Sequence, residues 1–347
     1  AYRVLRFDCR SLSVAAFRDM ISQSRHPCLI TGLHDCLAPR GLTLERLEQE
    51  LLPPDLAVPV RGRDGRWDAS RFFAALRSGE PVYLADAPVA RLCPWLLREV
   101  KVPRYFLHCF THRTRTPLPL AVETPALFVG AAGTRSSLHV DAMCSNFWML
   151  VTEGAKHWTT FHPDDAHLLS PEFDSDEQID RFPSLAELEA SAVNESPSSV
   201  AASSGIAAAS GGVAAARRLD FELRAGEVLY IPHGTPHEVH NLSATVSVSA
   251  NFLDQTNIAK SLRQGWEKVA RREPGTARHT NLRAVMEALD EVEWPEAAAD
   301  DLLDPHADRR CQPPRKLVGR FPSHERLKRV KPVKVGCGYA RELAGGG

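Results

Sequence analysis

From residue 126 onward, the chain consists of short β-rich segments that are separated by turn-forming residues. The segments are ALFVG, SLHV, FWMLV, KHWTTFH, EVLYIP, EVHNL and TVSVSANF, with Gly, Pro, Asn or Asp between them. Many short strands joined by such turns are typical of a β-sandwich or a β-barrel. The pattern therefore predicts a mainly β core over residues 126–255, with helices flanking it.

Residues 1–125 mix helical and extended patterns, and we expect these helices and strands to pack on the β core. Apolar residues recur at helical spacing in three stretches, and two apolar runs have the length of buried strands. The predicted elements are helices over 13–24, 43–52 and 69–79 and strands over 27–32 and 81–86. Ser13 is a candidate N-cap for the first helix.

Two further segments stand out around the core. Residues 190–216 are mainly Ala, Ser and Gly, with almost no large apolar side chain, which predicts a flexible surface insertion within the β region. Residues 256–272 and 280–293 are amphipathic and predict a helical hairpin over 256–294. Such a hairpin is suited to capping the core or to forming a homodimer interface.

Residues 295–347 are predicted to be a charged, partly irregular tail. Residues 287–304 carry eight acidic and no basic side chains, whereas residues 309–334 carry ten Lys or Arg and one acid, Glu325. The two segments could neutralise each other or be solvated. Alternatively, the basic segment is a candidate contact for nucleic acid.

The composition bears on whether the protein is membrane-bound or secreted and on the cellular compartment in which we expect it. No apolar run approaches the roughly 20 residues of a membrane helix, and the N-terminus AYRVLRFDCR lacks the apolar stretch of a secretory signal. The eight cysteines are scattered and form no Cys-x-x-Cys pair, which argues against a disulfide scaffold. We therefore expect no membrane association and a location in the cytoplasm or the nucleus.

A His-x-Asp motif occurs three times in the chain. His306 lies in a polar stretch without a nearby strand, and His162 is followed by Pro163, which forces a turn. Only His139, in SSLHVDAM, follows an apolar strand and has suitable partners downstream. His139 and Asp141 are therefore candidate metal ligands, although two polar residues at a strand end would give the same pattern.

The segment GEVLYIPHGTPHEVHNL, residues 226–242, supplies the third candidate ligand. In an extended strand His237 and Val239 point one way and His240 points the other. Two histidines and one carboxylate on one face of a metal are the arrangement of non-haem Fe(II) oxygenases. No thiolate stands nearby, which disfavours a structural zinc site.

Lys156 lies in KHWTTFH, seventeen residues after His139, and shares a strand face with Trp158 and Thr160. A lysine that faces the inside of a barrel is unfavourable unless it meets an anion, and a dicarboxylate cosubstrate would provide one. If the face points outward, Lys156 is simply solvated.

Together these segments resemble the JmjC family of cupin-fold Fe(II)- and 2-oxoglutarate-dependent oxygenases, in particular its small hydroxylases. The resemblance rests on HVD, the lysine seventeen residues later, GEVLYIPHGTPHEVHNL and TVSVSANF, and extends upstream to PCLITG, PVYLAD and VPRYF. It covers residues 1–260 apart from the insertion. It implies a double-stranded β-helix (jelly-roll) core and a reaction that uses Fe(II), 2-oxoglutarate and O2.

The resemblance also implies roles for individual residues. His139, Asp141 and His237 match the iron ligands, and Lys156 matches the residue that pairs with the distal carboxylate of 2-oxoglutarate. Further cosubstrate contacts are implied at Ser136, Ser249, Asn241 and Asn251. Trp158 and Phe147 are candidate pocket walls or core residues.

Two positions depart from the family pattern. Met149 stands where some relatives have an asparagine that contacts the cosubstrate, and Pro236 replaces an aromatic residue before the second histidine. These departures affect the expected binding of the cosubstrate, not the metal triad.

The resemblance implies hydroxylation of a protein side chain as the first choice of reaction. Lysine (histone) demethylation and RNA or tRNA base hydroxylation are the alternatives within the enzyme class. A catalytically silent binding module and a cupin that uses its metal without 2-oxoglutarate are alternatives outside it. The intact triad disfavours the first of these two, and Lys156 disfavours the second.

Overall fold

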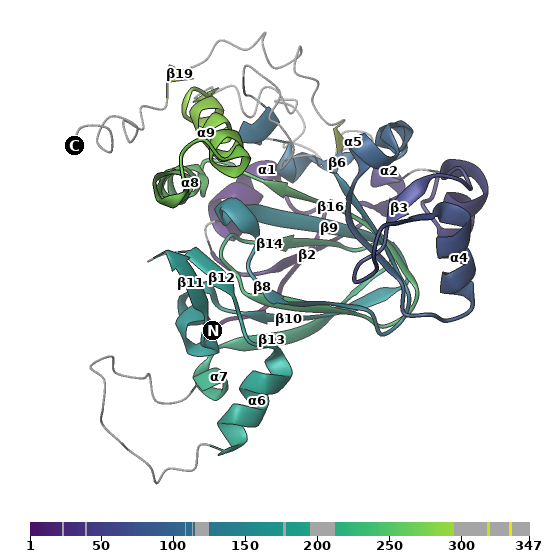
Figure 1. The fold of residues 1–347 in the computed structure, drawn as a ribbon, viewed down its shortest axis with the longest axis horizontal. Helices are drawn as coiled ribbons and strands as arrows, with labels where there is room; N and C mark the ends of the chain where they lie inside the picture. The colour runs from purple at the N-terminus through teal and green to yellow at the C-terminus, as the bar shows by residue number, and fades with distance from the viewer. Residues whose placement is uncertain are drawn as a thin grey trace.

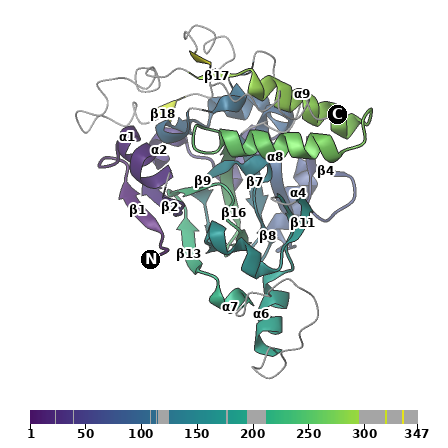
Figure 2. The ribbon, with the colours of Figure 1, turned by 90° about the vertical axis from the view of Figure 1, so that its left-hand side faces the viewer.

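The computed structural model describes residues 1–22, 24–38, 40–107, 109–112, 114, 125–175, 178–194, 212–294, 318–319 and 333–334. Two β-sheets dominate it and pack face to face, with helices around them (Figure 1). Helices α6 and α7 lie at one end of the molecule, and α8 and α9 lie at the opposite end (Figures 1 and 2).

The larger sheet has seven strands, and the smaller sheet has four. In spatial order, the larger sheet contains β1 (Leu5–Asp8), β2 (Cys28–Thr31), β14 (Val228–Ile231), β9 (Asn146–Glu153), β16 (Thr245–Phe252), β7 (Ala126–Gly130) and β5 (Tyr83–Pro88). The smaller sheet contains β13 (Arg218–Arg224), β10 (Ala155–Phe161), β15 (His237–Asn241) and β8 (Arg135–His139).

Eight strands between residues 126 and 252 form the jelly-roll core. Strands β7, β9, β14 and β16 belong to the larger sheet, whereas β8, β10, β13 and β15 form the smaller one. All pairings among these strands are antiparallel. The predicted double-stranded β-helix is therefore confirmed, and the seven segments predicted as strands all contain one.

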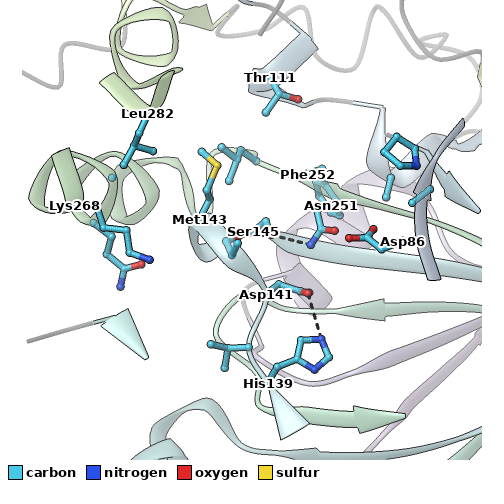
Figure 3. A pocket seen from close by; sticks show the side chains of 18 of the residues that line it. Asp86, Thr111, His139, Asp141, Met143, Ser145, Asn251, Phe252, Lys268 and Leu282 are labelled. Carbon is cyan, nitrogen blue, oxygen red and sulfur yellow. Dashed lines mark hydrogen bonds and ion pairs between the residues drawn. The ribbon is translucent and has the colours of Figure 1, made fainter. Parts of the chain in front are cut away.

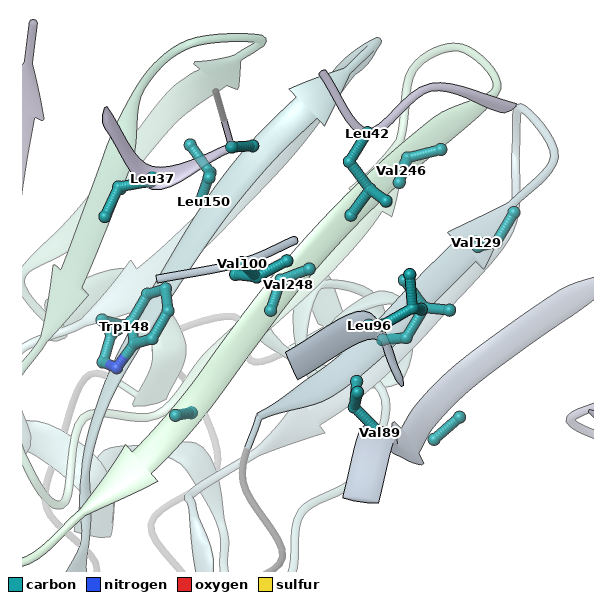
Figure 4. Packing of buried hydrophobic residues seen from close by; sticks show 14 of the residues in the cluster. Leu37, Leu42, Val89, Leu96, Val100, Val129, Trp148, Leu150, Val246 and Val248 are labelled. Atoms are coloured by element: carbon teal, nitrogen blue, oxygen red, sulfur yellow. The ribbon is translucent and has the colours of Figure 1, made fainter. Parts of the chain in front are cut away.

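The inner strands of the larger sheet, β14, β9, β16 and β7, are buried on both faces. On β9, Trp148 and Leu150 belong to the main apolar core, whereas Phe147 and Met149 belong to a second cluster between the two sheets. The main core lies between the larger sheet and the N-terminal helices and loops, as Figure 4 shows. Because both faces are covered, β9 and β16 have few exposed positions.

The N-terminal segment is part of the larger sheet rather than a separate layer. Strands β1 and β2 pair in parallel at one edge, and β5 pairs with β7 at the other. The predicted N-cap is confirmed, because the Ser13 hydroxyl accepts a hydrogen bond from the Ala16 amide. Short helices of this segment are α1 (Val14–Ala16), α2 (His34–Leu37), α3 (Leu44–Arg46), α4 (Ala69–Arg77) and α5 (Val89–Leu92).

Short 3-10 or π-helical turns, labelled η, occur both in the N-terminal segment and between strands of the jelly roll. They are η1 (Phe17–Ser22), η2 (Leu47–Leu51), η3 (Pro94–Arg98), η4 (Arg104–Phe106), η5 (Phe110–His112), η6 (Ala142–Cys144) and η7 (Pro163–Leu169). Two-stranded pairs complete the secondary structure: β3 (Ala57–Pro59) with β4 (Arg66–Asp68), β11 (Glu172–Ser175) with β12 (Gln178–Arg181), β6 (Val102–Pro103) with β18 (Val318–Gly319), and β17 (Glu293–Trp294) with β19 (Val333–Lys334).

The predicted helical hairpin is present as α8 (Ile258–Arg271) and α9 (Ala277–Asp290). The second helix begins three residues earlier than predicted, because the Thr276 hydroxyl caps the His279 amide. The helices approach closely at Gly265, where an added Cβ would overlap the buried side chain of Met286. The position therefore requires a residue without a side chain.

The prediction for residues 190–216 is wrong at both ends of the segment. Residues 190–194 form the C-terminal half of α6 (Leu185–Asn194). Near the other end of the segment, residues 212–215 form α7 (Gly212–Ala215). Alanine-rich sequence favours helix, and Leu185 and Leu188 anchor α6 in a buried cluster. Residues 195–211 of the insertion lie outside the described residues, as does most of the predicted tail, 295–347.

Two smaller features complete the comparison with the sequence. Strand β13 was not predicted, although RLDFELR alternates in polarity. The cysteines at 9, 28, 36, 93, 109 and 144 are buried and free, so the part of the chain described here contains no disulfide between them. No helix in the same part is long and apolar enough to cross a membrane.

Candidate metal centre

His139 and His237 face each other across two neighbouring strands. His139 ends β8, His237 begins β15, and the two residues are direct partners in the antiparallel pairing. Their ring centroids are 4.2 Å apart. Asp141 follows two residues later, with its Oδ1 4.0 Å from His139 Nε2 (Figure 3). One potential ligand atom of each of these three residues lies within 4.8 Å of those of the other two.

Backbone carbonyls orient both imidazole rings. His139 Nδ1 lies 2.6 Å from the carbonyl oxygen of Ser137, and His237 Nδ1 lies 2.9 Å from that of Thr235. A carbonyl only accepts, so each Nδ1 carries the proton and each Nε2 keeps a free lone pair. Such a contact to the outer nitrogen is typical of metal-binding histidines.

The donor atoms of the three residues and the protonation of His237 suit a cation. Burial, followed by the neighbouring His139, lowers the pKa of His237 to about 3, so this imidazole is neutral. Burial raises the pKa of Asp141, and His139 and Asn251 partly oppose this shift. The donor set is two imidazole nitrogens and one carboxyl group, with no thiol among them. It fits Fe(II) in the arrangement expected from the sequence.

A cavity of about 100 Å³ lies between the two sheets, directly behind the triad. We call it the inner cavity. Its apolar walls include Phe147, Met149 and Trp158. The two aromatic residues also belong to the buried cluster between the sheets, so they are both pocket walls and core residues. Trp158 stacks on His237, with the ring centroids 5.3 Å apart. These walls limit the access of water to the metal centre.

Lys156 is fully buried inside the barrel. Its Nζ donates a hydrogen bond of 2.7 Å to Asn241 Oδ1 and one of 3.4 Å to Thr245 Oγ1. The same nitrogen lies 5.5 Å from the centroid of the Tyr83 ring. Burial, helped by the positive charge of Arg61, lowers the pKa of Lys156 to about 7. No carboxylate is among these partners, so an anionic ligand would be the natural partner of this ammonium group.

Ser136 lines the inner cavity, as the sequence predicts, and accepts a 2.8 Å hydrogen bond from Arg61 Nη1. The Arg61 guanidinium lies 5.3 Å from the centroid of the Tyr83 ring. The side chains of Arg61 and Tyr83 both line this cavity. Two cations therefore flank Tyr83, and this part of the site favours an anion.

The other three predicted contacts occupy different places. Asn251 lines the cavity and donates a 2.9 Å hydrogen bond to Ser145 Oγ. Asn241 accepts from Lys156 and donates to Thr134 Oγ1, so it orients the lysine. Ser249 is buried on β16, two residues before Asn251 and on the same face of the strand. It is not among the residues that line the inner cavity.

A second, larger cavity of about 700 Å³ lies on the other side of the triad. We call it the outer cavity. It shares His139, Asp141, Asn251, Arg61 and Asp86 with the inner cavity, so the metal centre lies at the boundary between the two. The hairpin contributes part of its remaining wall, including Gln264 and the side chains of Lys268 and Leu282 (Figure 3).

Sequence reasoning missed three residues of the site: Arg61, Tyr83 and Asp86. All three come from the N-terminal segment. Tyr83 and Asp86 reach the cavities because β5 pairs with β7, and Arg61 is held beside them by a backbone hydrogen bond from its amide to the Tyr83 carbonyl. Tyr83 and Asp86 lie in the predicted strand 81–86, where polar residues at the end of an apolar run were the available signal. Arg61 lies in RGRDGR, which carries no such signal.

Comparison with known proteins gives relatives of the expected kind. The Arabidopsis thaliana protein named arginine-specific demethylase JMJ22 is 26% identical over 73% of this chain and 47% of its own length. The Caenorhabditis briggsae protein named bifunctional arginine demethylase and lysyl-hydroxylase psr-1 is 25% identical over 83% of this chain and 70% of its own. The human 2-oxoglutarate and iron-dependent oxygenase JMJD4 is 26% identical over 40% of this chain and 28% of its own.

The chain thus spans about half the length of the first of these relatives. Their names confirm the resemblance to JmjC proteins that the sequence predicted. The model of the cupin-like domain matches residues 58–258, which contain all three residues of the triad, Lys156 and the eight strands of the jelly roll. On this match the chain belongs to the cupin-like domain family.

Proposed function

We propose that the protein is an Fe(II)- and 2-oxoglutarate-dependent dioxygenase that hydroxylates a side chain of a protein substrate. The observation that carries this proposal is the arrangement of His139, Asp141 and His237, whose ligand atoms converge between two cavities. These three residues would hold the iron. Bound Fe(II) supplies the oxidative chemistry by which O2, 2-oxoglutarate and a substrate C–H bond give succinate, carbon dioxide and an alcohol.

The inner cavity suits the cosubstrate. A dicarboxylate placed there would reach from the metal centre toward Lys156, whose ammonium group would bind the distal carboxylate. Such a charge-assisted bond is strengthened by the low polarity of the surroundings. Arg61, hydrogen-bonded to Ser136, adds a second positive charge near the same carboxylates. The aromatic walls keep water away from the bound cosubstrate.

The outer cavity suits the substrate, because it is larger and borders the triad from the other side. Relatives named as arginine demethylases and a lysyl-hydroxylase support a protein side chain as substrate. Demethylation is the second candidate, since hydroxylation of an N-methyl group gives an unstable product that loses formaldehyde. The same names favour this second candidate, and it requires no change in the residues assigned above.

The test is anaerobic titration of the protein with Fe(II) and then with 2-oxoglutarate. We expect a visible metal-to-ligand charge-transfer band for the wild type and none for His139→Ala. Metal content after dialysis should fall in the same variant. The matched control is His167→Ala, an exposed histidine outside both cavities, which should behave like the wild type. A wild type that binds neither iron nor 2-oxoglutarate would refute the proposal and favour a silent binding module.

Three expectations from the sequence stay predictions. The basic segment 309–334, proposed to contact nucleic acid and to suit an RNA or tRNA substrate, lies outside the described residues except for four positions. A homodimer through 256–294 is testable by measuring the mass of the intact protein in solution. The choice between cytoplasm and nucleus requires localisation in cells.

A further inference from the structure

The turn that follows the triad residue Asp141 has an unfavourable backbone. Met143 and Cys144 have φ angles of +57° and +53°, in the left-handed region that residues with a side chain rarely adopt. Two such residues in succession persist only where neighbouring groups hold them in place. This turn, η6, begins directly after Asp141 and therefore needs contacts from outside itself to keep its shape.

Asn257 supplies such contacts from the start of α8. The residue is buried, with 2% of its surface exposed. Its Nδ2 donates a hydrogen bond of 3.0 Å to the carbonyl oxygen of Cys144 and one of 3.2 Å to that of Phe252. Its Oδ1 accepts a hydrogen bond of 2.8 Å from the Asp254 amide. One side chain therefore joins the η6 turn, the end of β16 and the start of the hairpin.

Asn257 does not use this side chain for the role that its place in the helix favours. It is the N-cap residue of α8, where an asparagine commonly accepts a hydrogen bond from an amide of the first helical turn. None of the described amides of α8 makes such a bond with it, because the side chain is turned back toward η6 and β16. Capping of the helix thus does not account for this residue, whereas holding the turn does.

The strand end that Asn257 holds leads back to the same turn. Phe252 follows Asn251, whose side-chain amide donates a 2.9 Å hydrogen bond to Ser145 Oγ, directly after η6 (Figure 3). Burial raises the pKa of Asp141, and hydrogen bonding by Asn251 is one of the effects that oppose this shift. Asp141 therefore lies between the two segments that Asn257 joins.

The hairpin also packs on this turn through apolar contacts. Helix α8 contacts η6, and Met143 packs against the apolar cluster that Ile258 and Leu262 form with α9. In Figure 3, Met143 lies on the side of the turn that faces the hairpin, whereas Asp141 lies beside His139. Apolar packing tolerates small shifts, but the directional hydrogen bonds of a buried amide specify one arrangement.

We propose that Asn257 is a positioning residue for the metal centre, which holds η6 in its unfavourable conformation and thereby places the Asp141 carboxylate for the metal. This inference rests on the proposed function, because it concerns the metal of the same triad. Asn257 is not among the ligands and lines neither cavity, so it acts only through the turn and the strand end. The hairpin then contributes to metal binding as well as to the wall of the outer cavity.

The test uses two variants of Asn257. Asn257→Asp keeps the size and the acceptor for the Asp254 amide but loses both donated hydrogen bonds, and Asn257→Ala loses all three. The matched control is Thr276→Ala, because Thr276 caps the other helix of the hairpin through the His279 amide. Thr276 lines neither cavity, so its replacement weakens the hairpin without reaching the turn.

Two measurements on the intact protein report on the metal and on the turn separately. The first is the dissociation constant for Fe(II) under anaerobic conditions, compared with the stability of each variant in chemical denaturation. The second uses the metal-free protein and follows the rate at which a thiol reagent labels Cys144, which is buried in η6. Local opening of the turn exposes this thiol without unfolding the protein. Cys93, buried in the main core, is the internal reference for global unfolding.

We expect both Asn257 variants to bind Fe(II) about 10-fold more weakly than the wild type, as is usual when a group that orients a metal ligand is lost. Labelling of Cys144 should be at least about 10-fold faster in both variants, with the rate at Cys93 unchanged. Thr276→Ala should match the wild type in both measurements even though it is less stable.

Three results would overturn the inference. The first is an Asn257→Asp variant that keeps the affinity for iron. The second is a Thr276→Ala variant whose affinity for iron falls in the same proportion to its stability, and the third is equal acceleration of labelling at Cys144 and Cys93. In the last two cases loss of stability alone explains the effect.

The two measurements also separate this inference from the proposed function. If the wild type binds no iron, the proposed function fails, whereas labelling of Cys144 still tests whether Asn257 holds the turn. If the wild type binds iron and the Asn257 variants bind it equally well, only the positioning role fails.

Discussion

Lys156 and Asn241 are direct partners across β10 and β15, and the lysine Nζ donates a 2.7 Å hydrogen bond to the asparagine Oδ1. Four residues further along β10, Thr160 is the partner of His237. The same pair of strands therefore fixes both the metal ligand and the lysine, four positions apart along the pair. Lys156 is not among the residues that line the inner cavity, but its Nζ lies 5.5 Å from the ring centroid of Tyr83, which does line it.

Replacing Lys156 by Met should weaken binding of 2-oxoglutarate by about 10- to 100-fold, because the substitution keeps the length but removes the charge. Binding of Fe(II) should be unchanged, since Lys156 is not among the ligands. The charge-transfer titration measures both quantities. Lys101→Met, a lysine outside the two cavities, is the matched control. Equal 2-oxoglutarate affinity in the two variants would contradict the role of Lys156.

The affinity for 2-oxoglutarate should also depend on pH. The pKa of Lys156 is lowered to about 7, mainly by burial, so above this pH the lysine of the free protein loses its charge. A bound carboxylate favours the charged form, so binding takes up a proton. The dissociation constant should therefore rise as pH increases above 7, by up to about tenfold per unit. Lys156→Met should bind weakly with a flatter pH dependence, and an equally steep dependence would assign the effect to another group.

The metal triad could be predicted because its signals are local. His139 and Asp141 are two residues apart at a strand end, and strand alternation separates His237 from His240. The structure confirms this alternation, since His237 lines the inner cavity and His240 instead contacts Glu238. The jelly roll was predictable for the same reason, because TVSVSANF coincides with β16.

The charged residues around the triad could not be predicted in this way. Arg61 and Asp86 come from a segment that the sequence does not connect with the barrel. The pairing of β5 with β7 brings Asp86 there, and a backbone hydrogen bond to Tyr83 brings Arg61. A bulge in β5 at Asp86 adds a residue that strand alternation does not anticipate. Asn241 was predicted to contact the cosubstrate. In the structure it accepts a hydrogen bond from Lys156, because β10 and β15 place the two residues opposite each other.

The hairpin makes a further prediction, because α8 and α9 meet at Gly265. Replacing Gly265 by Leu should destabilise the protein by about 1–3 kcal/mol, since the new side chain would overlap Met286 in a buried position. Ala259→Leu adds the same side chain at an exposed position of α8 and should be nearly neutral. Chemical denaturation measures the free energy of unfolding of each variant.

The Gly265→Leu variant should also distinguish the role of the outer cavity from that of the inner cavity. Gly265 lines the outer cavity and not the inner one. Below its unfolding transition, Gly265→Leu should therefore keep the affinity for Fe(II) and 2-oxoglutarate but process substrate more slowly. In a double-mutant cycle, adding Met286→Ala should recover part of the lost stability. If the stability losses of Gly265→Leu and Met286→Ala were additive in the double variant, the contact between the two helices would not be the cause of the destabilisation.

Phe106 should anchor the N-terminal segment to the jelly roll. It is buried in η4 and stacks on Trp148 and Tyr230 of the larger sheet, with ring centroids 5.8 and 6.0 Å away. Phe106→Ala should therefore cost about 3–5 kcal/mol of unfolding free energy and leave a single cooperative transition. Phe173→Ala, which removes a ring that is 52% exposed, should change stability by less than about 0.5 kcal/mol. Two separate transitions would instead mean that residues 1–125 fold independently of the barrel.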